Sequence, residues 1–256
     1  MGNFFAEPDD LFTFAFAISN SSATETAVVT LATEARELEH LSIEPNDLGL
    51  FEIPPPRPRK NVGTGKRKLA YRIDSTLPVA VYQFNPLQTA EYNASGRAIR
   101  LAASTDASML IPEHVLDKHY VVSAWEQTPA PGGWLSSYTG GSLLAIVATS
   151  VAADVTLMPT ANSVLGPGVT VAARVGTEYV VHLEPFEVLQ LTTVWTGEDF
   201  TGTRHHATAP VAVFAGNECA RIPASTNYCD HLEEQIFGLT TWAQEYVAVK
   251  TQKRGE

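Results

Sequence analysis

Two short segments decide the fold, Pro78-Val79-Ala80-Val81-Tyr82 and Pro210-Val211-Ala212-Val213-Phe214. In both, a proline precedes a run of Val, Ala and an aromatic residue, and an asparagine follows at Asn85 and Asn217. A proline at the start of a strand costs no ladder hydrogen bond. A run that is apolar on both faces is typical of the centre of a packed sheet. The sequence therefore predicts two similar central strands.

Three further blocks recur in the same order about 130 residues apart. The pairs are Val29-Thr30-Leu31 with Val155-Thr156-Leu157, Phe51-Glu52-Ile53 with Phe186-Glu187-Val188, and Tyr120-Val121-Val122 with Tyr246-Val247-Ala248. Four ordered matches predict two copies of one supersecondary unit. We place the first unit at residues 1–117 and the second at 118–256, and the two could also form one continuous domain.

Strand patterns dominate the rest of the chain, as short runs rich in Val, Thr, Ile, Tyr and Phe between Gly, Pro, Asn and Asp clusters. The expected strands cover 12–19, 27–33, 69–73, 79–84, 120–125, 143–149, 155–158, 169–175, 179–183, 187–193 and 211–215. The fold class is therefore all-β, with two tandem β-sandwich-like units of short antiparallel strands. A β-propeller-like arrangement is the alternative.

Helical patterns are scarce. The segment 32–41 contains helix-forming residues, although it could also be a strand that runs into a charged loop. Segments 112–116 and 230–236 could each form a turn or two of helix, the second with Asp230 as its N-cap.

Composition excludes several classes of function. The chain has 256 residues, 45% of them hydrophobic and 18% charged, which is typical of a globular protein. A net charge of −11 disfavours nucleic acid, whose binding depends on neutralising phosphates. No apolar run approaches the roughly 20 residues that span a bilayer, so membrane insertion is not expected. One basic stretch, residues 57–68, is either a solvated loop or a local anion site.

Cys219 and Cys229 flank a turn-rich stretch that contains Pro223. Such a pair favours a disulfide over a zinc site, which would need two further ligands nearby. The N-terminus lacks the basic start and long apolar run of a secretory signal. We expect the chain to be a piece cut from a longer precursor and to lack its signal peptide, because residues 9–14 enter a strand-like pattern almost at once.

Seven blocks occur in one order along nearly the whole chain: Phe16-Ala17-Ile18-Ser19-Asn20, residues 74–86, residues 106–112, Phe200-Thr201-Gly202-Thr203, residues 219–223, residues 229–235, and Trp242 with Glu245-Tyr246-Val247. Together they resemble the IgG Fc-binding domain family of an animal mucus protein and bacterial surface proteins. The resemblance implies a secreted or surface-exposed module that binds another macromolecule. Ala243 replaces an expected glycine, and Ile236-Phe237-Gly238 replaces a proline-containing stretch, so the ligand stays open.

Catalytic patterns are weak. No Gly-x-Ser-x-Gly elbow is present, and the phosphate-loop-like stretch 61–66 lacks the Ser or Thr that would hold magnesium. The segment Cys229-Asp230-His231, with Glu233 and Glu234, is a candidate acid–base or metal site, or else Asp230 caps a helix beside a bridged cysteine. His205 and His206 are adjacent and cannot easily share one ion from a strand, so we expect a solvated turn there.

Aromatic side chains beside Pro, Gly and Ser-rich loops offer a better functional signal. Trp125, Trp134, Tyr138 and Trp242 are candidates for protein or glycan recognition, or they cover the ends of the core. The leading hypothesis is a non-catalytic adhesion module without cofactor or metal, with Asp230 and His231 as further candidate binding residues. A structural repeat without its own ligand is second. A hydrolase using Asp230, His231 and Glu234 is third.

Overall fold

The structure is a computed structural model that describes residues 13–53, 63–85, 87, 90–92, 95, 98–101, 106–129, 140–226 and 229–249. Its strands are β1 (Phe14–Ser19), β2 (Ala27–Thr33), β3 (Arg36–Ile43), β4 (Leu48–Ile53), β5 (Gly65–Lys68), β6 (Arg72–Ser75), β7 (Ala80–Asn85), β8 (Ala90–Tyr92), β9 (Ala98–Leu101), β10 (Asp106–Met109), β11 (Asp117–Val121), β12 (Ser142–Ala148), β13 (Ala153–Met158), β14 (Tyr179–Leu183), β15 (Glu187–Thr192), β16 (Arg204–Ala220) and β17 (Asp230–Gln235). Two short 3-10 helices, η2 (Glu113–Val115) and η4 (Leu239–Thr241), follow β10 and β17. The predicted all-β class is confirmed.

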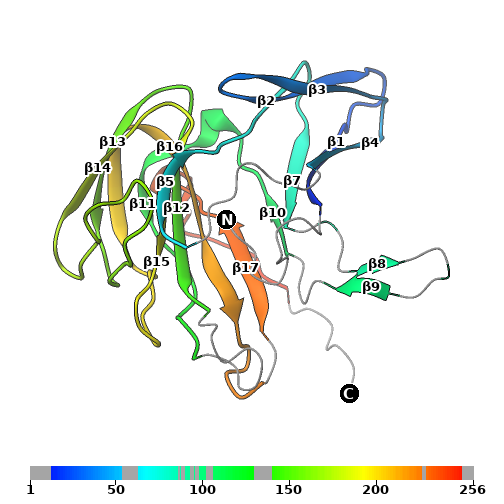
Figure 1. Cartoon of the computed structure of the whole chain (residues 1–256). Coiled ribbons are helices and arrows are strands. Elements are labelled where there is room, and N and C mark those ends of the chain that lie inside the picture. The colour runs from blue at the N-terminus through cyan, green and yellow to red at the C-terminus, as the bar shows by residue number, and fades with distance from the viewer. Residues whose placement is uncertain are drawn as a thin grey trace.

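Apart from the two-stranded sheet β8-β9, the strands form two bodies that lie side by side (Figure 1). The first body contains the sheet β10-β7-β1-β4 and the sheet β3-β2-β6. The second body is one eight-stranded sheet in the order β14-β13-β16-β12-β15-β5, in which β11 and β17 also pair with β16. An eight-stranded sheet disagrees with a propeller, whose blades have four strands.

Each body has its own apolar core. The first core gathers Phe16, Ile18, Val29, Leu31 and Phe51 between its two sheets. The second core is larger and is built from alternate residues of β12, β13, β15 and β16, with the fully buried Phe200 at one end. The period of two along each strand places these side chains inward, as the sequence pattern predicts.

The two bodies have the same strand order. The row β10-β7-β1-β4 of the first body matches β17-β16-β12-β15 of the second, and β3-β2-β6 matches β14-β13-β16. The registers also match, because Val29 faces Ser75 and Val155 faces Ala207. The two proline-led strands, β7 and the second half of β16, therefore occupy matching places. This agreement supports the predicted duplication, which stays a prediction, as does its boundary after residue 117.

One of the four recurring sequence blocks is misaligned. Phe51 faces Phe16 in the first body, whereas the matching position opposite Leu144 in the second body is Leu191. Phe186 instead precedes β15, with a positive φ of 62°. The predicted match is therefore wrong, because Phe51-Glu52-Ile53 and Phe186-Glu187-Val188 do not occupy equivalent positions in the two bodies.

Several predicted elements differ from the observed ones. Residues 69–71 are not a strand, because the chain crosses there from β5 in the second body to β6 in the first. The predicted strand 169–175 is a loop that turns at Pro167-Gly168 and folds back, with the Ala173 N–H donating to Ser163 Oγ. The predicted strand 120–125 ends at Val121, because the Thr203 N–H that would pair with Val122 bonds instead to the Phe200 carbonyl in a turn.

Two of the three segments that could form a helix are strands, which for segment 32–41 was the alternative expectation. Residues 36–43 form strand β3, and residues 230–235 form strand β17, because ladder pairing with β2 and β16 outweighs the local helix preference. Asp230 is therefore the first residue of a strand, and no helix is capped by it. The third prediction is confirmed, since η2 forms one turn at residues 113–115.

Candidate binding surface

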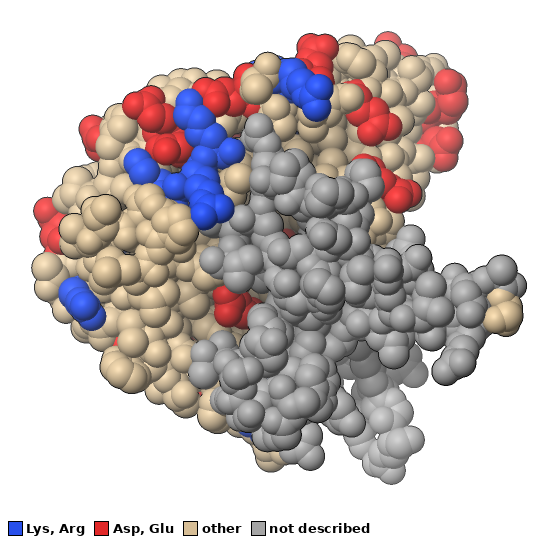
Figure 2. All heavy atoms as spheres, in the orientation of Figure 1, with Lys and Arg blue, Asp and Glu red and all other residues tan. Residues whose placement is uncertain are grey.

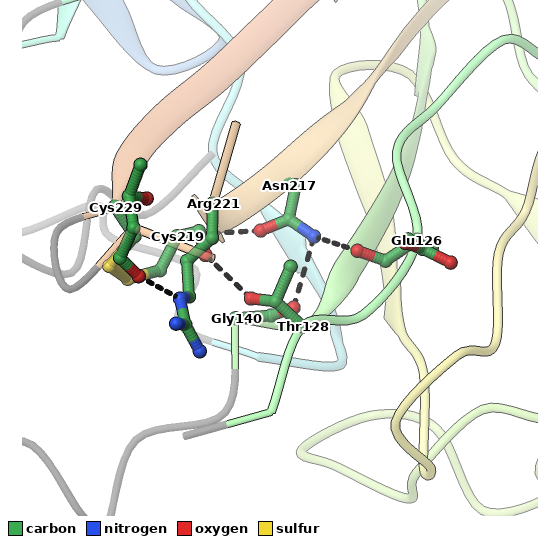
Figure 3. Close-up of a disulfide and its surroundings, with 8 residues drawn as sticks. Glu126, Thr128, Gly140, Asn217, Cys219, Arg221 and Cys229 are labelled. Carbon is green, nitrogen blue, oxygen red and sulfur yellow. Dashed lines mark hydrogen bonds between the residues drawn. A yellow bond between two sulfur atoms is a disulfide. The ribbon is translucent and has the colours of Figure 1, made fainter. Parts of the chain in front are cut away.

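The disulfide between Cys219 and Cys229 is present, as the sequence predicted, and its Cα atoms are 5.0 Å apart. It closes the turn between the end of β16 and the start of β17 (Figure 3). Within this loop, Arg221 Nε donates to the Thr226 carbonyl at 2.6 Å. Ile222 and Pro223 are exposed, so the bridge fixes the base of a loop whose outer part faces solvent.

Asn217 connects this disulfide loop to a second loop. Its fully buried side chain donates from Nδ2 to the carbonyls of Glu126 at 2.8 Å and Gly140 at 3.0 Å, while its Oδ1 accepts from the Cys219 N–H at 2.7 Å (Figure 3). Thr128 Oγ1 adds a bond to the Cys219 carbonyl at 2.9 Å. A buried amide satisfied on both sides holds the loop 122–129 rigidly against β16.

The loop 122–129 is also bonded to the loop 193–203. The Gln127 N–H donates to the Glu198 carbonyl at 2.7 Å, and the Gly197 N–H donates back to the Gln127 carbonyl at 2.8 Å. Each loop displays one exposed tryptophan, Trp125 at 38% and Trp195 at 67% exposure. We call these two loops, with the disulfide loop 219–229, the tryptophan face.

Glu198 fixes the backbone that carries Trp195. Its carboxylate accepts from the Trp195 N–H at 2.9 Å, from the Val194 N–H at 3.1 Å and from Asn162 Nδ2 at 2.5 Å. Burial on its own raises the pKa of Glu198, but these hydrogen bonds to the ionised form outweigh it and hold the pKa below its usual value. The carboxylate is therefore ionised at neutral pH and keeps the Trp195 loop in one conformation.

Asp230 and His231 do not form an exposed catalytic pair. Residues of β17 alternate, so His231, Glu233 and Gln235 are buried, whereas Asp230 and Glu234 are exposed. Because Asp230 and Glu234 face away from His231, the three side chains of the hydrolase hypothesis do not converge.

The buried face of β17 instead joins the two bodies. Glu233 accepts hydrogen bonds from Gln83 and from Asn85 of β7, the latter at 3.3 Å, and its own N–H donates to Asp106 of β10 at 2.5 Å. His231 Nε2 lies 3.1 Å from Glu233 Oε2. Burial alone raises the pKa of Glu233, but the hydrogen bond from His231 and those from its other partners lower it to about 2. An ionised carboxylate only accepts, so His231 Nε2 carries the proton of this bond.

The remaining candidates fall in other places. Trp242 is exposed at 56% but lies after η4, away from the tryptophan face in the chain. Trp134 and Tyr138 lie outside the described residues. His205 and His206 are in β16, so the predicted solvated turn is wrong. They point to opposite faces, with His205 buried against Tyr120 at a ring distance of 4.9 Å.

Trp195 was missed by sequence reasoning, although its neighbours Thr196-Gly197-Glu198-Asp199 are typical turn residues. The signal that identifies it is the same one that selected Trp125, an aromatic residue beside a turn.

The basic stretch is a strand where the structure describes it. Lys66, Arg67 and Lys68 lie on β5, which pairs with β15, so a solvated loop is wrong for these residues. Lys66 pairs with Glu187 at 3.3 Å and Lys68 with Glu34 at 2.5 Å. Figure 2 shows basic side chains gathered over this part of the surface, beside acidic ones. The ion pairs reduce the local positive charge.

Among the described residues, no helix combines the length and the apolar composition that a membrane span requires. No group of three or more His, Cys, Asp or Glu side chains among them is placed to hold a metal ion.

The fold and the surface together define a disulfide-bridged all-β module with rigid loops that display aromatic side chains. Comparison with known families gives one match, to the family described as IgGFc binding protein, over residues 106–256. The chain belongs to this family, and the predicted resemblance is confirmed. The matched part runs from β10 through every strand of the second body except β5, and it includes the tryptophan face. Comparison with curated proteins and with solved structures gives no match.

Proposed function

We propose that the chain is a non-catalytic extracellular module that binds a protein or glycan partner through the tryptophan face. The observation that carries the proposal is the pair Trp125 and Trp195, exposed on two loops that hydrogen-bond to each other. Large aromatic side chains held on a rigid backbone lose little conformational entropy on binding and are enriched among residues that dominate binding energy.

Two further observations support this function. A disulfide suits an oxidising compartment outside the cell, and the bridge here holds a loop of the proposed surface. The family of the chain is named for binding the Fc part of an immunoglobulin. The third hypothesis, a hydrolase, loses support because Asp230, His231 and Glu234 do not converge.

The test uses the purified chain on a glycan array and against a panel of secreted proteins that begins with immunoglobulin Fc. For any probe that binds, Trp125→Ala and Trp195→Ala should each weaken binding about tenfold or more. Trp242→Ala is the matched control, because it removes a tryptophan of intermediate exposure, 56%, that lies outside the face. Equal losses of affinity for all three variants, or no loss for Trp125→Ala and Trp195→Ala, would reject the proposal that the partner binds at the tryptophan face.

A further inference from the structure

The chain after η4 is apolar and exposed. Among residues 243–249, which we call the C-terminal segment, Tyr246 is 74%, Val247 is 103% and Val249 is 88% exposed. The residues Tyr246-Val247-Ala248-Val249 have the composition of a strand, yet no ladder pairing includes them in the described structure. Exposed apolar residues of this kind mark a surface that binds something.

The C-terminal segment matches β11 position for position. Both follow a 3-10 helix, and the Leu116 N–H bonds to the Glu113 carbonyl as the Trp242 N–H bonds to that of Leu239. The Asp117 N–H donates to the hydroxyl of Tyr120 at 2.9 Å, and in the same way the Ala243 N–H donates to that of Tyr246 at 2.7 Å. The C-terminal segment is therefore folded locally as the start of another β11.

The original β11 shows what such a strand binds. It pairs with the first half of β16, with Tyr120 opposite His205 and Val121 opposite Arg204. The Tyr120 hydroxyl donates to the carbonyl of Val211, the residue after the strand-leading proline, at 2.7 Å. Tyr120 is 1% exposed there, whereas its counterpart Tyr246 is 74% exposed.

The first body has a strand that could pair with such a segment, but no strand occupies that sheet edge among the described residues. β6 corresponds to the first half of β16 and is an edge strand in the order β3-β2-β6. Next to it lies a groove of about 750 Å³ whose lining includes Ile73, Leu77, Pro78 and Val79. Ile73, Arg72 and Val79 hold the positions that His205, Arg204 and Val211 hold in the second body, 132 residues later. An apolar groove thus lies where β11 and its tyrosine lie in the second body.

We propose that the C-terminal segment of one copy of the chain adds as an antiparallel strand to β6 of a second copy. The register of β11 places Tyr246 opposite Ile73 and Val247 opposite Arg72, with the Tyr246 hydroxyl directed at the Val79 carbonyl. Adding a strand to a sheet edge supplies main-chain hydrogen bonds, and the groove supplies a pocket for the tyrosine. Donor and acceptor are different surfaces, so the contact is head-to-tail and generates open chains of copies.

The same register sets a limit on affinity. Glu245 corresponds to His119 and falls opposite Asp74, which already pairs with Arg72 at 2.7 Å. Like charges directly across a ladder are destabilising. Association of the natural chain is therefore weak, and Glu245→Lys should strengthen it about threefold or more by placing a lysine opposite Asp74.

The first test is cross-linking between two variants of the whole chain. Arg72→Cys mixed with Val247→Cys should form a disulfide-linked heterodimer on a non-reducing gel, because directly opposed Cα atoms lie within reach of a disulfide. Ser75→Cys mixed with Val247→Cys is the control, since Ser75 is three residues further along the same strand and is too far in this register. Equal yields for the two mixtures would overturn the register.

The second test measures association by sedimentation at increasing concentration. Ala248 corresponds to Val122, whose N–H donates across the ladder to the Thr203 carbonyl at 2.9 Å. Ala248→Pro removes this ladder N–H at a residue that is exposed in the single copy, so it should weaken association about tenfold or more without unfolding the chain. Ala248→Thr keeps the N–H and favours a strand, and it should associate like the natural chain. A natural chain that stays monomeric into the millimolar range, or a proline variant that associates equally well, would show that the groove has another occupant and would overturn the proposal.

Discussion

The two bodies have one strand order but cover their proline-led strands differently. In the second body Val211 and Val213 are fully buried, because β16 is continuous and is flanked by β11, β12, β13 and β17. In the first body the corresponding strand is divided into β6 and β7, and the counterparts of these two residues, Val79 and Val81, are only half-buried. The same apolar pattern therefore gives a buried strand only where neighbouring strands cover it. The missing neighbour of the first body corresponds to β11.

The two bodies are joined through buried polar contacts. β17 belongs to the second body, yet its buried face presents Glu233 to Gln83 and Asn85 of the first. Gln235 adds a further contact between the bodies, since its Oε1 accepts from the Ile111 N–H at 2.7 Å. A buried hydrogen-bonded network favours one relative placement of two elements. Substitutions in this network therefore test how tightly the two bodies are coupled.

The largest effect is expected from Glu233→Ala. Removing one member of a buried charged network leaves Gln83, Asn85 and His231 without its carboxylate, which costs about 3–5 kcal/mol of the free energy of unfolding. Urea denaturation followed by tryptophan fluorescence measures the loss. Glu234→Ala is the matched control, because this neighbour on the same strand is exposed and should change stability by less than about 0.5 kcal/mol. A loss below about 1 kcal/mol for Glu233→Ala would show that water reaches the contact between the two bodies.

The pH dependence of stability provides a second control for Glu233. Its folded pKa of about 2 lies below the ordinary value of 4.5, so its contribution is complete above about pH 4.5 and is lost as the pH falls toward 2. The natural chain should lose more stability over this interval than Glu233→Ala, in which the group is absent. Parallel profiles for the two chains would contradict the ionised assignment of Glu233.

Much of the fold could be predicted from sequence because its strands follow an alternating or fully apolar pattern. The strands 27–33 and 179–183 were predicted with their observed bounds. The strands β3 and β17 could not be assigned, because their polar residues pair with distant partners that local preference does not reveal. The charged residues Glu37 and Glu39 of β3 face solvent, whereas Glu233 of β17 is buried by the other body.

The candidate site was predicted only in part. The disulfide and Trp125 follow from local composition, and both were found from sequence. That Trp125 lies beside the Trp195 loop depends on two backbone hydrogen bonds that join Gln127 to Gly197 and Glu198, about 70 positions further along the chain. No local pattern encodes such a contact. The burial of His231 likewise depends on packing between bodies.

An intermediate effect is expected from removing the disulfide with Cys219→Ser and Cys229→Ser together. The bridge closes a loop with a sequence separation of 10 residues, for which chain entropy predicts a loss of about 3 kcal/mol. The loss should appear in the second body first, because the bridge connects β16 and β17. Hydrogen exchange should therefore rise around Asn217 and Cys219 before it rises in β2 and β3. Uniform exchange across both bodies would contradict this order and indicate a single cooperative unit.

The smallest expected effect is the difference in stability between variants of the two corresponding tyrosines, Tyr120 and Tyr246. Tyr120→Phe removes a buried hydroxyl that accepts from the Asp117 N–H and donates to the Val211 carbonyl, so it should cost about 1–2 kcal/mol of unfolding free energy. Tyr246→Phe removes a hydroxyl that is bonded to Ala243 at an exposed site, and the single copy should lose less than about 0.5 kcal/mol. Measured at low and high protein concentration, the Tyr246 variant should differ from the natural chain only at high concentration, where copies contact one another. Equal losses of unfolding free energy for both substitutions at every concentration would contradict this expectation. They would mean that Tyr246 is already in an environment like that of Tyr120, and that the two bodies do not differ at this position.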